Sequence, residues 1–219
     1  MEEIEMVETT SDAFVDHVDH SIGGFGGHSF RRLTHVSMAI LPYLYYVHGN
    51  EIASVFQLES NQFVSLACVL ILLVEALRLK FGIVIIGQRE YESSQISALA
   101  WGALAVSLAL LVAPKEDGEE LSSGLYGVPI IIGMTIVDPL MGEIKRTKQD
   151  LRLAIIAGLI ASYCIWLASY YWLGTDIRAA IILAPLTVAG ELPKTRAIDD
   201  NATMVLLPLS GLILMYPFL

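Results

Sequence analysis

Long stretches almost free of charge recur along this chain of 219 residues and constrain its fold more than any other feature. They occupy residues 33 to 48, 62 to 74, 96 to 113, 121 to 137, 153 to 175, 179 to 190 and 202 to 219. A bilayer-spanning helix needs about 20 predominantly apolar residues, a length that several of these stretches approach. The second stretch reaches it only by continuing through Glu75 to Leu79. We therefore predict an all-α integral membrane protein with about seven transmembrane helices.

The composition supports a membrane protein and argues against several other classes. Apolar residues make up 55% of the chain and charged residues 16%, and the mean hydropathy is +0.62. Asp and Glu outnumber Lys and Arg by 23 to 13, and this acidic balance argues against nucleic acid as a partner. Cys68 and Cys164 each lie within an apolar stretch, where we expect free thiols rather than a disulfide.

The first 30 residues differ from the remainder of the chain. They carry seven acidic residues and no Lys or Arg, and they end in the glycine-rich stretch SIGGFGGHSF. A signal peptide begins with positive charge and an apolar core, so this segment does not match one. We predict an acidic, flexible cytoplasmic tail over residues 1–30 and a membrane-embedded helical domain over residues 31–219.

The positions of the positive charges predict the orientation in the cell membrane. With seven crossings, all Lys and Arg residues except Lys115 and Arg178 lie on the same side as the N-terminus. Cytoplasmic loops carry an excess of Lys and Arg, so we place the N-terminus in the cytoplasm and the C-terminus outside. With six crossings Lys194 and Arg196 would face outward, and the same orientation would follow from a smaller charge difference.

Three segments on the predicted cytoplasmic side hold acids and bases together. They are GQREYESSQ, VDPLMGEIKRTKQD and GELPKTRAIDDN. Asp138 ends one apolar stretch, and Asp199 and Asp200 precede another on the same side, so the three could form an oxygen site for Mg²⁺ with substrate phosphates. The alternative is that Asp138 marks the membrane interface and that Asp199, Asp200 or Asn201 caps a helix.

Basic residues follow Asp138 closely. Lys145, Arg146 and Lys148 would neutralise phosphates beside a metal ion, as phosphoryl transfer requires. The alternative is the ordinary excess of positive charge in cytoplasmic loops.

A second candidate site lies within the second stretch, where Glu75 and Arg78 are three residues apart and share a helical face. Ionisable residues within a membrane span usually face a cavity or the bundle interior. His35 shares a face with Arg31 at the entry to the first stretch. The alternative for the pair is that Arg78 reaches the interface while Glu75 compensates its charge.

Five segments together resemble the dolichol kinase family, whose members are integral membrane kinases of polyprenols, phytol or diacylglycerol that usually take phosphate from CTP. RRLTH at 31 to 35 is similar to the family's basic-basic-x-x-His entry to the first helix, and EALR at 75 to 78 to its Glu-x-x-Arg. REYESSQISALAWG at 89 to 102 resembles the segment in which an arginine and acids precede a small-residue helix. DPLMGEIKRTK at 138 to 148 resembles the Gly-Asp loop and its basic residues, with Val137 in place of the glycine. AIDDNATMVLLPLSGL at 197 to 212 is similar to the end of many archaeal members.

The resemblance implies a membrane lipid kinase that transfers the terminal phosphoryl group of CTP to the hydroxyl of a polyprenol or dolichol-type isoprenoid alcohol, on the cytoplasmic face. Asp138 and Asp199 would bind Mg²⁺, and Asp200 would accept the proton of the alcohol. Glu75 and Arg78 would order the catalytic cavity. Nucleotide binding would fall to Arg89, Lys145, Arg146, Lys148, Lys194 and Asn201.

Two other functions remain open at this point. KRTKQD is faintly similar to elements of CDP-lipid synthases, which would make the chain a cytidylyltransferase that releases pyrophosphate. A non-catalytic lipid carrier or transporter could instead use Glu75 and Arg78 as a translocation pair. No Walker loop, GxSxG, HExxH or CxxC motif points to a soluble enzyme.

Overall fold

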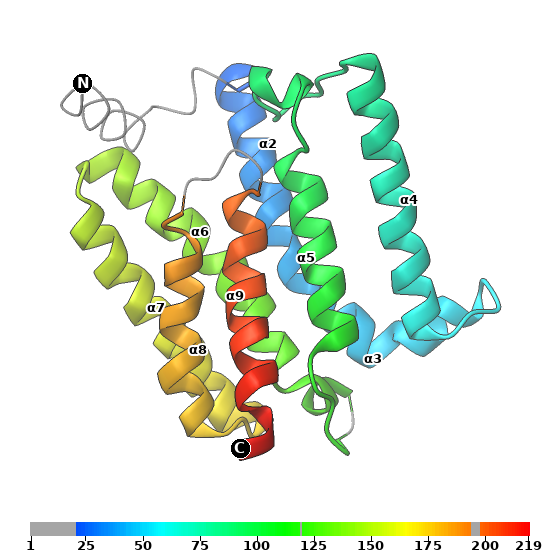
Figure 1. Ribbon diagram of the computed structural model, residues 1–219, viewed down its shortest axis with the longest axis vertical. Helices are drawn as coiled ribbons and strands as arrows, with labels where there is room; N and C mark the ends of the chain where they lie inside the picture. Colours follow the sequence, from blue (N-terminus) through cyan, green and yellow to red (C-terminus); the bar gives the residue numbers. More distant parts are fainter. Residues whose placement is uncertain (1–20, 119, 194–197) are drawn as a thin grey trace.

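The computed structural model describes residues 21–118, 120–193 and 198–219, and within these ranges it is helical and contains no β-strand (Figure 1). Residues 1–20 of the predicted tail, Lys194 and Arg196 lie outside the described residues. In chain order the α-helices and the 3₁₀ helices (η) are α2 (Gly24–Ser37), η2 (Met38–Ile40), α3 (Leu41–Ser54), α4 (Ser60–Phe81), η3 (Glu90–Ser93), α5 (Ala98–Val112), η4 (Glu120–Gly124), α6 (Gly127–Lys148), α7 (Leu151–Leu173), α8 (Ile177–Gly190), α9 (Asp200–Met215) and η5 (Tyr216–Phe218).

Four helical segments are long and apolar enough to cross a membrane. They are α4, α6, α7 and the continuous segment Asp200–Phe218, which joins α9 to η5. α5 and α8 are also apolar but shorter. The architecture is therefore that of an all-α protein with helices suited to a bilayer, as the charge-free stretches indicated.

The ends of the helices follow local sequence signals. The side chains of Ser97, Asp150 and Asp176 accept backbone N–H groups at the starts of α5, α7 and α8. Glu59 and Gln62 form a reciprocal capping box at the start of α4. These caps explain why the observed boundaries lie within a few residues of the apolar stretches.

The first predicted membrane helix differs most from the structure. The stretch 33 to 48 is divided between α2 and α3 by η2, and α3 begins next to Pro42, whose missing N–H suits the first turn of a new helix. α2 also begins at Gly24, inside the glycine-rich stretch that we assigned to the tail. Hydrogen bonds from Ile22 and Gly87 tie this stretch to the segment that precedes η3.

α6 also departs from the predicted boundary. The apolar stretch ended at Val137, but the helix continues through Pro139 to Lys148. Proline removes one backbone hydrogen bond, whereas Lys145, Arg146 and Lys148 in the last turn interact favourably with the helix dipole. Asp138 therefore lies within α6 and not at its end.

The core of the bundle is built around α6 and α9. Both helices contribute residues with no exposed surface, among them Ile130, Met134, Met204 and Leu212. α6 contacts α2, α5, α7, α8 and α9. Because α9 packs beside α5, α6 and α8, its first turn is brought to the middle of one end of the bundle.

A close crossing holds α8 against α9. A Cβ on Gly190, the last residue of α8, would lie 2.6 Å from the backbone of Met204. Only glycine allows this approach, and it places the residue after it, Glu191, beside the start of α9.

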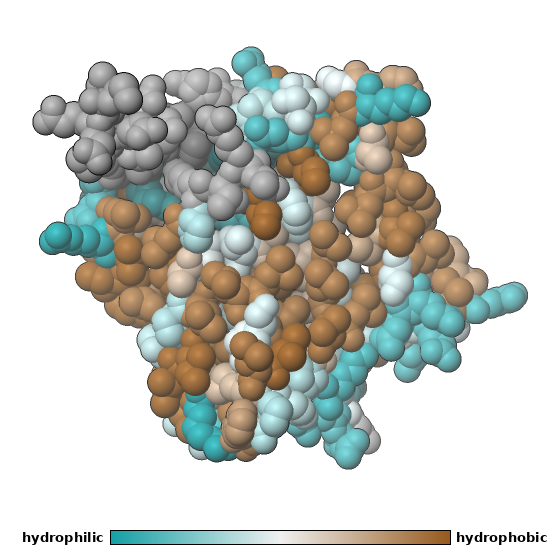
Figure 2. Space-filling model, viewed as in Figure 1, coloured by the Kyte–Doolittle hydropathy of each residue, from teal (hydrophilic) through white to brown (hydrophobic). Residues whose placement is uncertain are grey.

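The outer surface is apolar. Figure 2 shows hydrophobic side chains over the flanks of the helices, with hydrophilic residues concentrated toward the ends. Large exposed apolar side chains occur on α4 and α7, including Leu73, Val74, Ile156 and Ile160. In water such a surface would be unfavourable, whereas in a bilayer it faces lipid.

Candidate functional site

A cavity of about 830 Å³ opens at the end of the bundle where α9 begins, the upper end in Figure 1. Its walls come from α2, from the segment between α4 and α5, from the second half of α6, and from the ends of α8 and α9 that face each other. Four of the five segments that resemble the kinase family contribute most of the polar wall, and only EALR at 75 to 78 does not line it. The predicted site residues that line it are Arg89, Asp138, Lys145, Arg146, Asp199, Asp200 and Asn201.

Three carboxylates converge in this cavity. One oxygen each of Asp138, Glu191 and Asp200 lies within 4.8 Å of the others, a spacing suited to a shared cation. They come from α6, from the residue after α8 and from the first turn of α9. Sequence reasoning paired Asp138 with Asp199, but the Asp199 carboxylate accepts the backbone N–H of Asn201 as the cap of α9. Asp199 lines the same cavity without belonging to the three-carboxylate cluster.

The cluster has more negative charge than its neighbours balance. Lys145 forms an ion pair with one oxygen of Glu191, and the His35 Nε2 lies 3.5 Å from an Asp138 oxygen. The other Glu191 oxygen, Oε2, is buried and finds no hydrogen-bond partner among the described residues. The Asn201 Oδ1 is also buried and has no hydrogen-bond partner among the described residues. Buried oxygens without donors are costly, and a bound cation would satisfy them.

Burial and mutual repulsion change the acidity of this group. The pKa of Glu191 is well above its ordinary value because the side chain is buried and lies near Asp200 and Asp138. Burial and the neighbouring Asp200 raise the pKa of Asp199 to about 8. Burial and neighbouring carboxylates thus favour the protonated form of these carboxyls more than water does. A divalent cation would compete with these protons and release them on binding.

Cations surround the acidic cluster. Arg31 donates to Glu92 at 2.6 Å, Arg32 donates to Glu143 at 2.6 Å, and Arg146 also bonds to Glu143. The Arg89 Nη1 donates to the Tyr91 hydroxyl, while the Arg89 Nε is buried without a partner among the described residues. These four arginines, Arg31, Arg32, Arg89 and Arg146, form a ring of positive charge that could bind the phosphates of a nucleotide, which carry several negative charges.

The pKa of His28 reflects the positive charge around the cavity. Its pKa is lowered, first by burial and then by Arg32, Arg146, Arg89 and Arg31. Four arginines from α2, α6 and the segment before η3 thus act on one imidazole. An anion entering the cavity would meet the same field.

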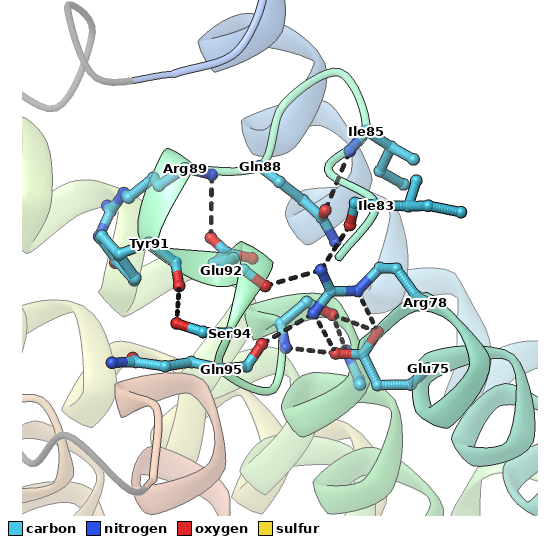
Figure 3. Close-up of polar contacts among 12 residues, drawn as sticks. Glu75, Arg78, Ile83, Ile85, Gln88, Arg89, Tyr91, Glu92, Ser94 and Gln95 are labelled. Carbon is cyan, nitrogen blue, oxygen red and sulfur yellow. Dashed lines mark hydrogen bonds and ion pairs between the residues drawn. The ribbon is translucent and has the colours of Figure 1, made fainter. Parts of the chain in front are cut away.

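Glu75 and Arg78 lie beside the cavity but do not line it. The Arg78 Nε and Nη2 donate to the two Glu75 oxygens at 2.9 and 2.8 Å (Figure 3). The remaining Arg78 donors reach the carbonyls of Ile83, Glu92 and Gln95 at 2.7 to 2.8 Å. Glu75 also accepts the Ser97 N–H at 2.6 Å. The pair therefore fixes the segment from Ile83 to Ser97, which carries Arg89 and Glu92 to the cavity.

The other predicted phosphate ligands are placed differently. Lys148, the last residue of α6, does not line the cavity, and Lys194 lies outside the described residues. Val137, which replaces the family's usual glycine, is fully buried, and a Cβ on Gly158 of α7 would lie 3.4 Å from it. Its side chain therefore fills the core between α6 and α7 and does not line the cavity.

Sequence reasoning missed Glu191, Glu92 and His28. Glu191 lies in the charged segment GELPKTRAIDDN, but the pattern does not show that Gly190 draws it against α9. Glu92 lies in REYESSQ, where Glu90 is equally plausible from the sequence; only Glu92 is buried and bound to Arg31. His28 lies in the glycine-rich stretch and gains neighbours only because that stretch is helical.

Part of the cavity wall is apolar. Phe30 and Met38 come from the first helical segments, Ile85 and Ile86 from the segment after α4, and Leu99 from the first turn of α5. The cavity therefore combines carboxylates, cations and an apolar wall. Comparison with protein families, curated proteins and solved structures finds no match to this chain.

Proposed function

We propose that this protein is a membrane phosphotransferase that moves the terminal phosphoryl group of a nucleoside triphosphate to the hydroxyl of a lipid alcohol. One observation carries the proposal: a single cavity joins the Asp138–Glu191–Asp200 cluster to a ring of arginines and to an apolar wall. Phosphoryl transfer needs charge neutralisation and positioning, and a lipid acceptor needs an apolar approach. The resemblance of five segments to the dolichol kinase family favours CTP as donor and an isoprenoid alcohol as acceptor.

The site residues have distinct roles in this proposal. Asp138, Glu191 and Asp200 hold Mg²⁺, which would neutralise charge on the phosphate oxygens. Glu191 replaces Asp199 in the predicted ligand set because its second oxygen is buried and unsatisfied among the described residues. Asp199 instead caps α9 and so fixes the position of Asp200.

The remaining groups bind the nucleotide and the acceptor. Arg89, Lys145 and Arg146 face the cavity and bind phosphate oxygens. A carboxylate has two oxygens, so Asp200 can offer one to the cation and accept the proton of the alcohol with the other. Lys148 and Lys194 stay predicted phosphate ligands, and Asn201 a predicted nucleotide ligand whose Oδ1 is available.

Seven membrane crossings, with the cavity in the cytoplasm, form part of this proposal. Consecutive helices from α4 to α9 alternate in direction between the two ends of the bundle (Figure 1), and residues 33 to 48 stay the predicted first crossing. The cavity end carries Arg31, Arg32, Arg89, Lys145 and Arg146, and an excess of positive charge favours the cytoplasmic side.

The test uses purified protein in detergent with Mg²⁺, a γ-labelled nucleotide, and a panel of dolichol, geranylgeraniol and diacylglycerol. Label in a lipid phosphate, with release of the nucleoside diphosphate, is the expected result. Release of pyrophosphate would instead identify a cytidylyltransferase. Absence of both products across the panel would overturn the proposal.

A matched pair of variants tests the site itself. Asp138→Asn should lower turnover about 100-fold or more, because a charged ligand to the Mg²⁺ that neutralises the reacting phosphate is lost. Asp176→Asn removes an exposed carboxylate at the start of α8 and should retain full turnover. Equal activity in both variants would exclude Asp138 from the reaction.

A further inference from the structure

A second cavity, of about 610 Å³, opens at the opposite end of the bundle, the lower end in Figure 1. Small-molecule sites usually have volumes of about 300–1,000 Å³, so it is large enough for a ligand. Its walls come from the segment between α5 and η4, the start of α6, the turn between α7 and α8, and η5. The proposed phosphoryl transfer uses none of its lining residues, so this cavity needs an explanation of its own.

Exposed aromatic residues mark this end of the bundle. Tyr171 and Trp172, in the last turn of α7, and Phe218 of η5 are 77–84% exposed. Tryptophan and tyrosine are enriched where a membrane meets water. α7 and the segment Asp200–Phe218 are both long and apolar enough to cross a membrane, and both end here. The second cavity therefore lies at the level of the lipid head groups.

Thr175 brings an unsatisfied hydroxyl to this cavity. The residue is 1% exposed, and its Oγ1 has no hydrogen-bond partner within the described part of the chain. A buried oxygen without a partner costs free energy, which a ligand that donates a hydrogen bond would recover. Three tyrosines line the same cavity, and the rings of Tyr126 and Tyr216 meet edge to face with their centroids 6.0 Å apart. The faces of such rings attract cations.

Glu116 adds negative charge to the cavity. Its carboxylate accepts a hydrogen bond from the Tyr216 hydroxyl at 2.8 Å, and no Lys or Arg of the described residues forms an ion pair with it. The adjacent Lys115 directs its ammonium instead to the Tyr45 hydroxyl at 2.8 Å and to Asn61 at 3.1 Å. The cavity thus offers acceptor oxygens, aromatic faces and uncompensated negative charge, which suit a cation that carries N–H donors.

Arg178 supplies positive charge beside the cavity. Asp176 is fully used, because it caps α8 and accepts from the Arg178 guanidinium. Of the five N–H donors of Arg178, one on Nε and one on Nη2 bond to Asp176, while the second on Nη2 and one on Nη1 bond to backbone oxygens of Leu219 and Phe218. The remaining Nη1 donor has no acceptor among the described residues, and the side chain is 55% exposed. It is therefore open to an anion.

We propose that this second cavity binds the head group of a phospholipid with a primary ammonium, whose nitrogen lies between Glu116 and Thr175 and whose phosphate meets Arg178. A primary ammonium has three N–H donors, which suit the Glu116 carboxylate and the Thr175 oxygen, and its charge suits the tyrosine faces. A quaternary ammonium has no N–H and would leave Thr175 unsatisfied. The site is independent of the proposed phosphoryl transfer.

The first measurement compares two lipids that differ only in the head group. The purified full-length chain in detergent is titrated with phosphatidylethanolamine or with phosphatidylcholine of the same acyl chains, and bound lipid is counted by native mass spectrometry. One phosphatidylethanolamine should bind about tenfold more tightly than phosphatidylcholine, because charged hydrogen bonds to the ammonium are made only by the former. Equal affinities would overturn the site. Soluble glycerophosphoethanolamine that competes as well as the lipid would overturn the membrane as the source.

Matched variants locate the binding. Glu116→Gln and Thr175→Val should each abolish the preference for phosphatidylethanolamine, whereas Thr175→Ser, which keeps the hydroxyl, should retain it. Glu120→Gln, at an exposed carboxylate of η4 that does not line the cavity, should also retain it. An unchanged preference in both Glu116→Gln and Thr175→Val would refute the assignment.

Stability without lipid separates binding from folding. In lipid-free detergent, Thr175→Val should unfold at a temperature equal to or above that of wild type, because a buried hydroxyl without a partner is removed. Phosphatidylethanolamine should then raise the unfolding temperature of wild type and Thr175→Ser more than that of Thr175→Val. The same increase in all three would show that the lipid acts elsewhere and would overturn the site.

Discussion

Two groups of charged side chains, one buried and one partly buried, lie at the same end of this bundle and differ in how many of their polar atoms have hydrogen-bond partners. The Arg78 guanidinium uses its donors on Glu75 and on three backbone carbonyls, and Glu75 in turn accepts from Ser97. The Asp138–Glu191–Asp200 cluster instead brings three carboxylates together near Lys145 and leaves a buried Glu191 oxygen without a partner among the described residues. The first arrangement is complete by itself, and the second becomes complete only with a ligand.

The difference teaches how to interpret ionisable residues in an apolar chain. Both groups looked alike in the sequence, as acids and bases in or near membrane helices. A fully bonded buried pair stabilises one conformation of the surrounding backbone, here the segment from Ile83 to Ser97. A buried excess of charge costs free energy when empty and is typical of binding and catalytic sites.

The largest effect is expected at the unsatisfied cluster. Glu191→Gln removes one of three negative charges and should weaken Mn²⁺ binding, and with it turnover, about 100-fold because a ligand to the cation is lost. Calorimetric titration with Mn²⁺ measures the affinity, and Glu51→Gln, at an exposed residue of α3, is the control.

The stability of the Glu191→Gln variant distinguishes a ligand-binding role of this carboxyl from a structural one. Without a cation, Glu191→Gln should unfold at a temperature equal to or above that of wild type at pH 7, because the buried carboxyl, whose pKa is raised by burial and by Asp200 and Asp138, costs stability there that a neutral amide does not. Mg²⁺ should raise the unfolding temperature of wild type only. A marked loss of stability in the cation-free variant would contradict the comparison.

The opposite behaviour is expected of the satisfied pair. Arg78→Ala leaves the Glu75 carboxylate buried and unpaired and should cost about 3–5 kcal/mol in the free energy of unfolding. Hydrogen exchange should increase over residues 83 to 97, which lose three bonds to the guanidinium. Arg78→Lys keeps the charge but supplies fewer donors, so an intermediate stability is expected. A stable Arg78→Ala protein that only fails in turnover would assign Arg78 to the reaction itself.

A smaller effect is expected at Arg89, which lies in the segment held by Arg78 and also lines the cavity with the three carboxylates. Its segment is fixed by Arg78, while its side chain faces the cavity with a buried Nε that lacks a partner among the described residues. Arg89→Gln should raise the KM for the nucleotide about tenfold, since a charged hydrogen bond is worth about 1.5–3 kcal/mol. The kcat and the unfolding temperature should change little. Steady-state kinetics with varied nucleotide, alongside Lys80→Gln outside the cavity, provide the check.

The smallest effect is expected at the far end of the bundle. The hydrogen bond and charge of Arg178 lower the pKa of the exposed Asp176. A lowered pKa means that the ionised carboxylate stabilises the fold above about pH 4, the value in an unfolded chain, and that this contribution is lost as the pH falls through the lower folded-state value. Asp176→Asn should therefore be slightly less stable than wild type at pH 7 and equal to it near pH 2, in chemical unfolding curves. A larger difference at low pH would reverse the sign of this linkage.

Much of the fold could be predicted from the sequence. The apolar stretches located α4, α5, α7, α8 and α9 to within a few residues, because a helix in a bilayer satisfies its own backbone and needs only length and apolar side chains. The prediction was wrong for the first stretch, which Pro42 and η2 divide into two helices. It also ended α6 too early, at Val137. Both errors concern helical segments at a proline or with charged residues, whose limits hydropathy does not show.

The candidate site was predicted only in part. Asp138, Asp200, Asn201 and the basic residues Arg89, Lys145 and Arg146 were singled out, and the structure brings them to one cavity. Glu191 was not singled out from the sequence, although it lines the same cavity. Glu75 and Arg78 were assigned to catalysis, but they do not line the cavity. Their assigned role in ordering it agrees with the hydrogen bonds that hold the segment after α4.

The sequence by itself determined that this chain forms apolar helices, and that its acids and bases gather in segments between them, because hydropathy and charge are local properties. Only the tertiary structure decided which of those charges meet. Gly190 lets α8 approach α9 closely enough to carry Glu191 to Asp200, and α6 delivers Asp138 to the same point. Whether a buried charge is satisfied depends on residues distant in the chain, and that distinction separates the scaffold at Glu75 and Arg78 from the proposed reaction site.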